Sequence, residues 1–214
     1  MTQRSRTRTR ADNEPRVLLA LVLVAVGVSA IAPRVYGTWL LEVAPVLLAV
    51  PILVAGYSRF RFTAVAYRAL TVGALFIALG AHYSYADAPP GEWLRAWLDL
   101  DRNPYDRVGH VIQGAVSALV AREVLLRCTP LRPGRWLAVV VTGMALALSG
   151  GFEIVEAFAG AVTGNVGEVY LGTQGDALDA QWDMLCAFGG AIAVQWMFHR
   201  THDRHLTERL PRSS

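Results

Sequence analysis

Residues 105–114 read Tyr105-Asp106-Arg107-Val108-Gly109-His110-Val111-Ile112-Gln113-Gly114, and the chain that follows is mainly apolar as far as about Leu126. This stretch places an acid, a base and an imidazole at the entrance of a segment long enough to span a bilayer. Ionisable groups at the edge of the hydrocarbon region must be paired, hydrated or coordinated. The stretch therefore predicts a membrane helix that begins in a polar site.

The composition of the whole chain is that of a membrane protein. Of its 214 residues, 54% are hydrophobic and only 17% are charged, and the mean hydropathy is +0.36. A soluble domain has fewer hydrophobic residues than this. The net charge is only +3, and we expect the lipid bilayer as a partner and no nucleic acid. No disulfide is expected, because Cys128 and Cys186 are far apart in sequence and Cys128 lies near the reducing face.

Runs of apolar residues predict an all-α fold in which six transmembrane helices form one bundle. The helices are expected at about residues 17–35, 40–57, 62–85, 106–126, 136–158 and 178–198. Residues 1–16 have too little apolar surface to fold and are expected to form a basic cytoplasmic tail. Residues 199–214 are expected to form a polar cytoplasmic tail. A cleavable signal peptide is the alternative interpretation of the first apolar run, because Val28-Ser29-Ala30 resembles a cleavage site.

The longer loops differ in character. Residues 86–104 are polar, but Trp93 and Trp97 are spaced as on one face of a helix, which predicts a short interfacial helix over residues 92–98. A glycine-rich loop is expected between the fifth and sixth spans.

The arginines predict the orientation of the bundle. With the amino terminus in the cytoplasm, 16 of the 20 arginines lie on the cytoplasmic side, and 12 of the 17 acids lie on the other side. This is the bias that the positive-inside rule requires. We therefore expect a protein of the cell inner membrane with both termini in the cytoplasm. The oligomeric state is left open.

This topology brings four polar clusters to one depth at the outer face. Spans three and five end there, and spans four and six begin there. The clusters are His82-Tyr83, Asp106-Arg107 with His110 and Gln113, Glu153 with Glu156, and Asp176 with Asp179 and Asp183.

The spacing within these clusters favours a site that holds a metal ion. Asp106 and His110 are four residues apart and Glu153 and Glu156 three apart, so each pair lies on one face of its helix. Helical bundles build metal sites from acids and imidazoles that project inward in this way. Such ligands suit Mn²⁺, Fe²⁺, Mg²⁺ or Zn²⁺. The candidate ligands are Asp106, His110, Glu153, Glu156, Asp176, Asp179 and Asp183.

The same residues predict further roles. Asp106, His110, Glu153 and Asp183 are candidate catalytic acid–base groups. The candidate substrate-binding residues are Arg107, which could clamp a phosphate, and Gln113, His82, Tyr83 and Gln174.

Structural explanations compete with these roles. Asp106 and Asp179 could be helix caps that complement the macrodipole. Capping does not explain Glu153 and Glu156, which stand at a carboxyl end, or Asp183, which lies a turn inside its span. We interpret Arg122-Glu123 as a local pair, the histidines of residues 199–205 as a solvated face, and the small residues at 149–151 and 187–191 as sites of close helix packing.

These stretches resemble the YjdF-like family of bacterial inner-membrane proteins, whose function is unknown. The matching segments are His82 to Ala86, Arg102 to His110 with Gln113-Gly114, Arg122-Glu123, the Glu153/Glu156 pair, and Leu171 to Met184. The chain departs from the family at Ala115-Val116-Ser117, Leu178 and Ala157, which lie beside the acids and affect the local packing. The order of acids and histidine is also similar to that of VanZ-like membrane proteins. The resemblance implies a location in the inner membrane and supplies no reaction.

Three functions are consistent with the sequence. The leading hypothesis is a metal-assisted site that binds or hydrolyses a lipid headgroup, or another small-molecule substrate, at the outer leaflet. The alternatives are a proton-coupled transporter or permease, in which the same acids relay protons, and a non-catalytic membrane scaffold. Whether the protein is an enzyme is left open.

Overall fold

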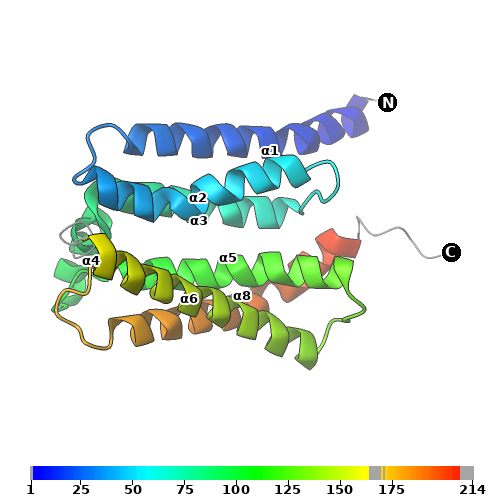
Figure 1. The fold of residues 1–214 in the computed structure, drawn as a ribbon. Coiled ribbons are helices and arrows are strands. Elements are labelled where there is room, and N and C mark those ends of the chain that lie inside the picture. The colour runs from blue at the N-terminus through cyan, green and yellow to red at the C-terminus, as the bar shows by residue number, and fades with distance from the viewer. Residues whose placement is uncertain (1, 164–169, 171, 208–214) are drawn as a thin grey trace.

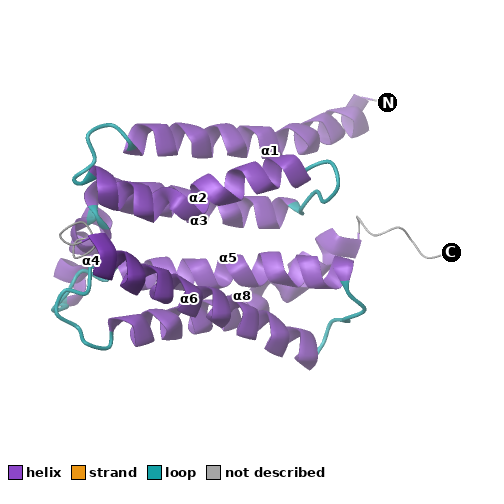
Figure 2. Ribbon diagram, in the orientation of Figure 1, coloured by secondary structure: helices purple, strands orange, loops and turns teal. Residues whose placement is uncertain are grey.

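The computed structural model describes residues 2–163, 170 and 172–207. Within these residues all regular elements are helices, as Figure 2 shows, and the predicted all-α fold is confirmed. The helices are α1 (Thr2–Ser29), α2 (Tyr36–Gly56), α3 (Ala64–Tyr83), the 3-10 helix η1 (Tyr85–Asp87), α4 (Pro89–Leu98), α5 (Tyr105–Cys128), α6 (Arg135–Thr163) and α8 (Asp179–Thr207).

The long helices form two layers of three (Figure 1). One layer holds α1, α2 and α3, and the other holds α5, α6 and α8. The layers meet where α3 packs against α5. The helical ends of the chain lie at one end of the bundle, and α4 lies at the opposite end. The start of α5, the end of α6 and the start of α8 therefore lie together, as the predicted convergence of the polar clusters requires.

Three of these helices are long and apolar enough to cross a membrane. They are α2, α3 and α6. Each of the helices α1, α5 and α8 carries charged residues in its sequence, such as Glu14 in α1 and Asp106 and Glu123 in α5. The predicted membrane spans are thus supported for three segments. Large apolar side chains such as Ile52 and Ile154 are exposed on the outside of the bundle, as they are where a protein faces lipid.

Helices α5 and α8 make the most extensive contact of the bundle, because glycines let their backbones touch. A Cβ atom added to Gly114 would lie 1.9 Å from the carbonyl oxygen of Ala187, and one added to Gly190 would lie 2.1 Å from that of Val111. The prediction that the small residues at 187–191 allow close packing is confirmed. Farther along the two helices, Ala118 and Ala191 belong to a fully buried apolar core.

The short helix predicted over residues 92–98 is observed as part of α4. Trp93 and Trp97 on this helix are 72% and 80% exposed. Tryptophan is enriched at the boundary between lipid and water, and the location of α4 at that boundary stays a prediction.

The ends of the chain differ from the prediction. Helix α1 begins at Thr2, so residues 2–16 are helical although they were expected to be too polar to fold. Glu14 in this stretch forms an ion pair of 2.5 Å with Arg68 of α3. At the other end, α8 continues to Thr207 instead of ending near residue 198. Residues 2–16 are thus helical where they precede an apolar helix and pair with Arg68, and the segment after residue 198 is helical as the continuation of α8.

The buried side chain of His202 also corrects the prediction. The tail histidines were interpreted as a solvated face, but His202 is fully buried, and its Nε2 lies 3.4 Å from Oε2 of Glu123. Glu123 also accepts hydrogen bonds from Arg127 and from the backbone and hydroxyl of Thr63. Glu123 therefore connects the start of α3 with α5 and α8. Its role is wider than the local pair with Arg122 that the sequence predicted. His199 and His205 lie outside the residues whose side chains the structure describes.

Candidate functional site

Three helices supply the polar residues of the site. Helix α5 presents Asp106 and His110 from its first two turns, α6 presents Ser149 and Glu153 before its end, and α8 presents Asp183 from its second turn. The spacing of four residues puts Asp106 and His110 on the same face of α5. Because α6 ends where α5 and α8 begin, the five side chains meet inside the second layer of the bundle.

The imidazole of His110 lies at the centre of this group. Its Nε2 is 3.7 Å from Oδ1 of Asp106 and 3.4 Å from Oε1 of Glu153. Asp106, His110 and Asp183 each offer one ligand atom, and these three atoms lie within 4.8 Å of one another. All three residues are buried. One cation could therefore contact the three side chains together.

The other ring nitrogen of His110 faces Ser149. Nδ1 lies 3.3 Å from the hydroxyl oxygen of Ser149, which is fully buried. In the tautomer that carries its proton on Nδ1, the ring donates a hydrogen bond to this hydroxyl, and the lone pair of Nε2 is directed at the acids. Histidines that bind metals usually have a hydrogen-bond partner of this kind on their second nitrogen.

Two arginines neutralise the acids at the outer rim. Arg107 forms an ion pair of 2.5 Å with Asp176, and Arg102 pairs with Asp179 and lies 3.5 Å from Asp176. Arg102 also donates a hydrogen bond to the carbonyl oxygen of Thr173. These pairs bind the start of α8 to the start of α5. Among the described residues His110 is the basic side chain within 4.0 Å of Asp106 and Glu153, and the two arginines act on the inner acids from farther away.

The side of the site toward the first layer is aromatic. Tyr105 stacks on Phe76 of α3 at a ring distance of 4.0 Å and donates a hydrogen bond to its carbonyl oxygen. Tyr85 contacts the edge of Tyr105. Burial, and then the nearby Glu156, raises the pKa of the Tyr170 phenol, so this group is a neutral hydroxyl at physiological pH. Aromatic rings therefore pack next to the start of α5, where Asp106 is buried.

Gln174 has a positioning role in the structure. Its Oε1 accepts a hydrogen bond from the backbone N–H of Asn103, and its Nε2 donates one to the Asn103 carbonyl. Asn103 is itself buried and donates to the carbonyl of Ala88 and the carboxylate of Glu92. Gln174 thus connects the segment before α8 to the segment before α5. Both ends of its amide are engaged with Asn103, and its predicted role in substrate binding stays a prediction.

The predicted site residues fall into three groups. The structure brings Asp106, His110, Glu153 and Asp183 together, with Gln113 beside His110. The rim consists of Arg107, Asp176 and Asp179, and Glu156 lies near enough to interact with Asp106 electrostatically. His82 and Tyr83 have other contacts: His82 hydrogen-bonds the carbonyl of Ser29 at the end of α1, and Tyr83 packs against His82.

Sequence reasoning missed several polar residues of the site. Ser149 was interpreted only as a small packing residue, and Arg102 was not assigned a role. Glu42 of α2 is also buried near Asp106, and its Oε2 has no hydrogen-bond partner within the described residues. A lone acid inside an apolar segment is itself a signal of function, and it could have identified Glu42. The sequence around Ser149 contains no comparable signal, because the role of this residue depends on its contact with His110 of α5.

Comparisons with known proteins agree with the helical structure. Residues 14–204 match the family described as "Predicted membrane protein (DUF2238)". The chain is 40% identical over 194 residues to the inner membrane protein YjdF of Escherichia coli (strain K12), and the match covers 91% of each chain. No solved structure matches the chain. The matched residues include the acids, the histidine and the arginines of the site, and the chain belongs to the DUF2238 family of membrane proteins.

Proposed function

We propose that the protein is a six-span protein of the bacterial inner membrane, with a site on the periplasmic side that holds a divalent metal ion and acts on a phosphate-bearing lipid headgroup. In this proposal residues 1–16 and 199–214 lie on the cytoplasmic side and residues 17–198 contain the spans. The arginine bias supports both termini in the cytoplasm. The name of the E. coli relative supports the inner membrane.

The observation that carries the proposal is the group formed by Asp106, His110 and Asp183. Their ligand atoms lie within 4.8 Å of one another in a buried place. Glu153 adds a third carboxylate at 3.4 Å from the imidazole. Carboxylates buried so close together repel one another unless they take up protons or share a cation. A divalent cation satisfies them and uses the nitrogen that His110 directs at the acids.

The ligand set favours a hard or borderline metal ion. Carboxylate oxygens with one imidazole suit Mn²⁺, Fe²⁺, Zn²⁺ or Mg²⁺. A metal ion bound here would supply a Lewis acid for a phosphoryl oxygen and lower the pKa of a bound water. Glu153, whose Oε1 lies 3.4 Å from Nε2 of His110, would serve as the general base at this site.

The rim arginines are suited to an anionic headgroup. The side chain of Arg107 is 30% exposed, so part of its guanidinium is open to the outer side. The Nε and Nη2 atoms of Arg102 are buried and have no hydrogen-bond partner within the described residues. A phosphate accepts hydrogen bonds from such guanidinium groups with good geometry. The phosphate would thus lie between the rim arginines and the buried acids.

The structure favours this proposal over a transporter in one respect. A second polar cluster, formed by Glu123, Arg127 and His202, lies at the other end of α5. Between the two clusters the backbones of α5 and α8 are in contact at Gly114 and Gly190. At this contact the two helices meet through glycine and the main chain, without a charged side chain between them in the described residues.

Metal analysis of the detergent-purified protein tests the proposal. After incubation with Mn²⁺ or Zn²⁺ and removal of excess metal, we expect the wild type to retain about one equivalent. Asp106→Asn and Asp183→Asn should lose it, because each removes a ligand charge. Asp101→Asn is the matched control, since Asp101 is an exposed acid just before α5. Substoichiometric metal in the wild type, or equal metal in all variants, would overturn the proposal.

A further inference from the structure

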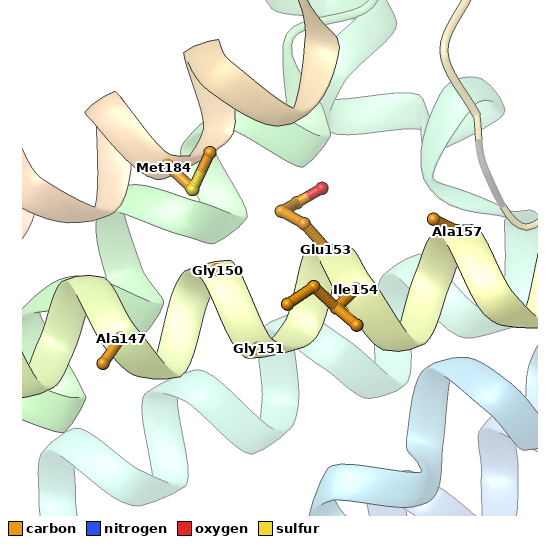
Figure 3. Close-up of a pocket in the computed structure, with 7 residues that line it drawn as sticks. All are labelled: Ala147, Gly150, Gly151, Glu153, Ile154, Ala157 and Met184. Atoms are coloured by element: carbon orange, nitrogen blue, oxygen red, sulfur yellow. The ribbon is translucent and has the colours of Figure 1, made fainter.

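An open apolar groove lies between α6 and α8 beside the candidate site. It has a volume of about 550 Å³. Figure 3 shows its walls, with Met184 of α8 directed toward α6. The lining residues are Ala147, Gly150, Gly151, Glu153, Ile154, Ala157 and Met184. Helix α6 is one of the helices long and apolar enough to cross a membrane, and Ile154 of the lining is 72% exposed, so these apolar walls suit a surface that faces lipid.

Two adjacent glycines create the space. A Cβ atom added to Gly151 would meet nothing within 4 Å, and one added to Gly150 would lie 3.4 Å from Sδ of Met184. Larger side chains at these positions would occupy the groove without meeting the backbone. The groove therefore depends on the absence of two side chains on the lipid-facing side of α6.

Glu153 connects the groove to the buried acids. Its carboxylate is the one charged group of the lining, and Oε1 lies 3.4 Å from Nε2 of His110. In Figure 3 the Glu153 side chain extends from α6 into the space between α6 and α8. The groove is thus apolar along its length and reaches the polar site at one residue.

We infer that the substrate of the site enters sideways from the bilayer, with one acyl chain of a phospholipid in the α6–α8 groove and its headgroup at the site. This inference rests on the proposed function, and it names the substrate as a membrane-embedded amphiphile instead of a water-soluble molecule. The apolar walls match a hydrocarbon chain. The guanidinium groups of Arg102 and Arg107 on the outer side match an anionic headgroup.

A second copy of the chain is the competing occupant. Gly143, Ala147 and Gly151 follow one another at intervals of four residues, which is the spacing that allows membrane helices to pair. A paired helix would not supply the anion that the guanidinium groups of Arg102 and Arg107 can bind, whereas a phospholipid headgroup would. The charges beside the groove therefore favour a lipid over a helix.

Photolabelling of the full-length protein in nanodiscs tests the inference. The discs contain phosphatidylethanolamine and a minor share of phosphatidylglycerol whose acyl chain carries a diazirine, and adducts are located by peptide mass spectrometry. We expect labelling of Met184 and Ile154 about tenfold above that of Leu148, which is exposed on α6 outside the groove lining. A tenfold ratio corresponds to a free energy about 1.4 kcal/mol more favourable for the acyl chain in the groove than at the exposed surface of α6.

Two glycine variants provide the matched comparison. Gly151→Leu fills the groove and should reduce the labelling of Met184 to the level of Leu148. Gly143→Leu is the control, because a Cβ atom there also meets nothing within 4 Å and Gly143 does not line the groove. If the Gly151 variant does not fold, Ala157→Leu fills the groove from its other end. Both glycine variants should bind metal as the wild type does.

The outcomes separate the inference from the proposed function. Equal labelling of Met184, Ile154 and Leu148 in the wild type would overturn the inference even if metal is bound. Enriched labelling in a protein that binds no metal would support the groove as a lipid site and overturn the metal proposal. A dimer that both leucine variants convert to monomer, with no enriched labelling, would show that a second copy covers the groove and would overturn the inference.

Discussion

Nδ1 of His110 lies 3.3 Å from the hydroxyl oxygen of Ser149, and this contact joins α5 to α6 at the centre of the candidate site. It determines which nitrogen of the imidazole faces Asp106 and Glu153. The contact joins His110, which the sequence predicted as a site residue, to Ser149, which it did not. Its removal should therefore affect the site more than the fold.

Ser149→Ala is expected to weaken metal binding about 10–100-fold, because the imidazole loses the partner that orients it. Ser117→Ala is the matched control, since the Ser117 hydroxyl donates to the carbonyls of Gln113 and Gly114 in its own helix. Competition with a chromophoric chelator gives the affinities, and the pH dependence of binding should shift in the Ser149 variant alone. Equal affinities in both variants would assign Ser149 a packing role.

Arg102→Gln is expected to lower the free energy of unfolding by about 3–5 kcal/mol, because Asp179 loses its partner in a largely buried pair. Asp179→Asn in the same chain should recover part of this loss. The exposed pair of Arg95 and Glu92 provides the control, and Arg95→Gln should cost less than about 1 kcal/mol. Unfolding by dodecyl sulfate in mixed micelles measures both. A small effect of Arg102→Gln would mean that water replaces the ion pair.

Gly190→Ala and Gly189→Ala should differ strongly although they are neighbours. The new Cβ atom at Gly190 would lie 2.1 Å from the carbonyl oxygen of Val111, whereas at Gly189 it meets nothing within 4 Å. The helices must separate in the first variant, which we expect to cost about 1–3 kcal/mol. The second should be neutral or slightly stabilising, because alanine favours the helix. Similar midpoints in the same unfolding assay would contradict the close contact of α5 and α8.

The proposed orientation predicts which cysteines are reachable from outside the cell. Asp99→Cys, in a chain with both native cysteines replaced by serine, should react with a membrane-impermeant maleimide on intact cells. Native Cys128 is exposed at the far end of α5 and should react only after the cells are permeabilised. Labelling of Cys128 on intact cells would reverse the orientation.

The sequence predicted the parts of the site that depend on helix ends. Apolar runs located the start of the helix with Asp106, whereas the helix with Glu153 continues to Thr163, five residues beyond its predicted end. An alternating topology brings these two helix ends together. The sequence could not predict contacts that depend on the rotation of one helix against another. Ser149 and Glu42 are such cases, since neither has a partner near it in sequence.

The chain ends were predicted less well for a different reason. Composition describes residues 2–16 and the segment near His202 as polar, and polar segments were expected to remain solvated. The structure instead contains Glu14 paired with Arg68 and His202 against Glu123. These partners are distant in sequence, so only the packing of the bundle brings them together.

The backbone contact between α5 and α8 fixes the distance between two of the candidate metal ligands. His110 stands on one of these helices and Asp183 on the other, one to two turns from the glycines that touch the opposite main chain. Main-chain atoms have no rotamers, so the spacing of the two ligands does not depend on how bulky side chains pack between the helices. Substitutions elsewhere in the core can therefore accumulate while the distance between His110 and Asp183 is conserved.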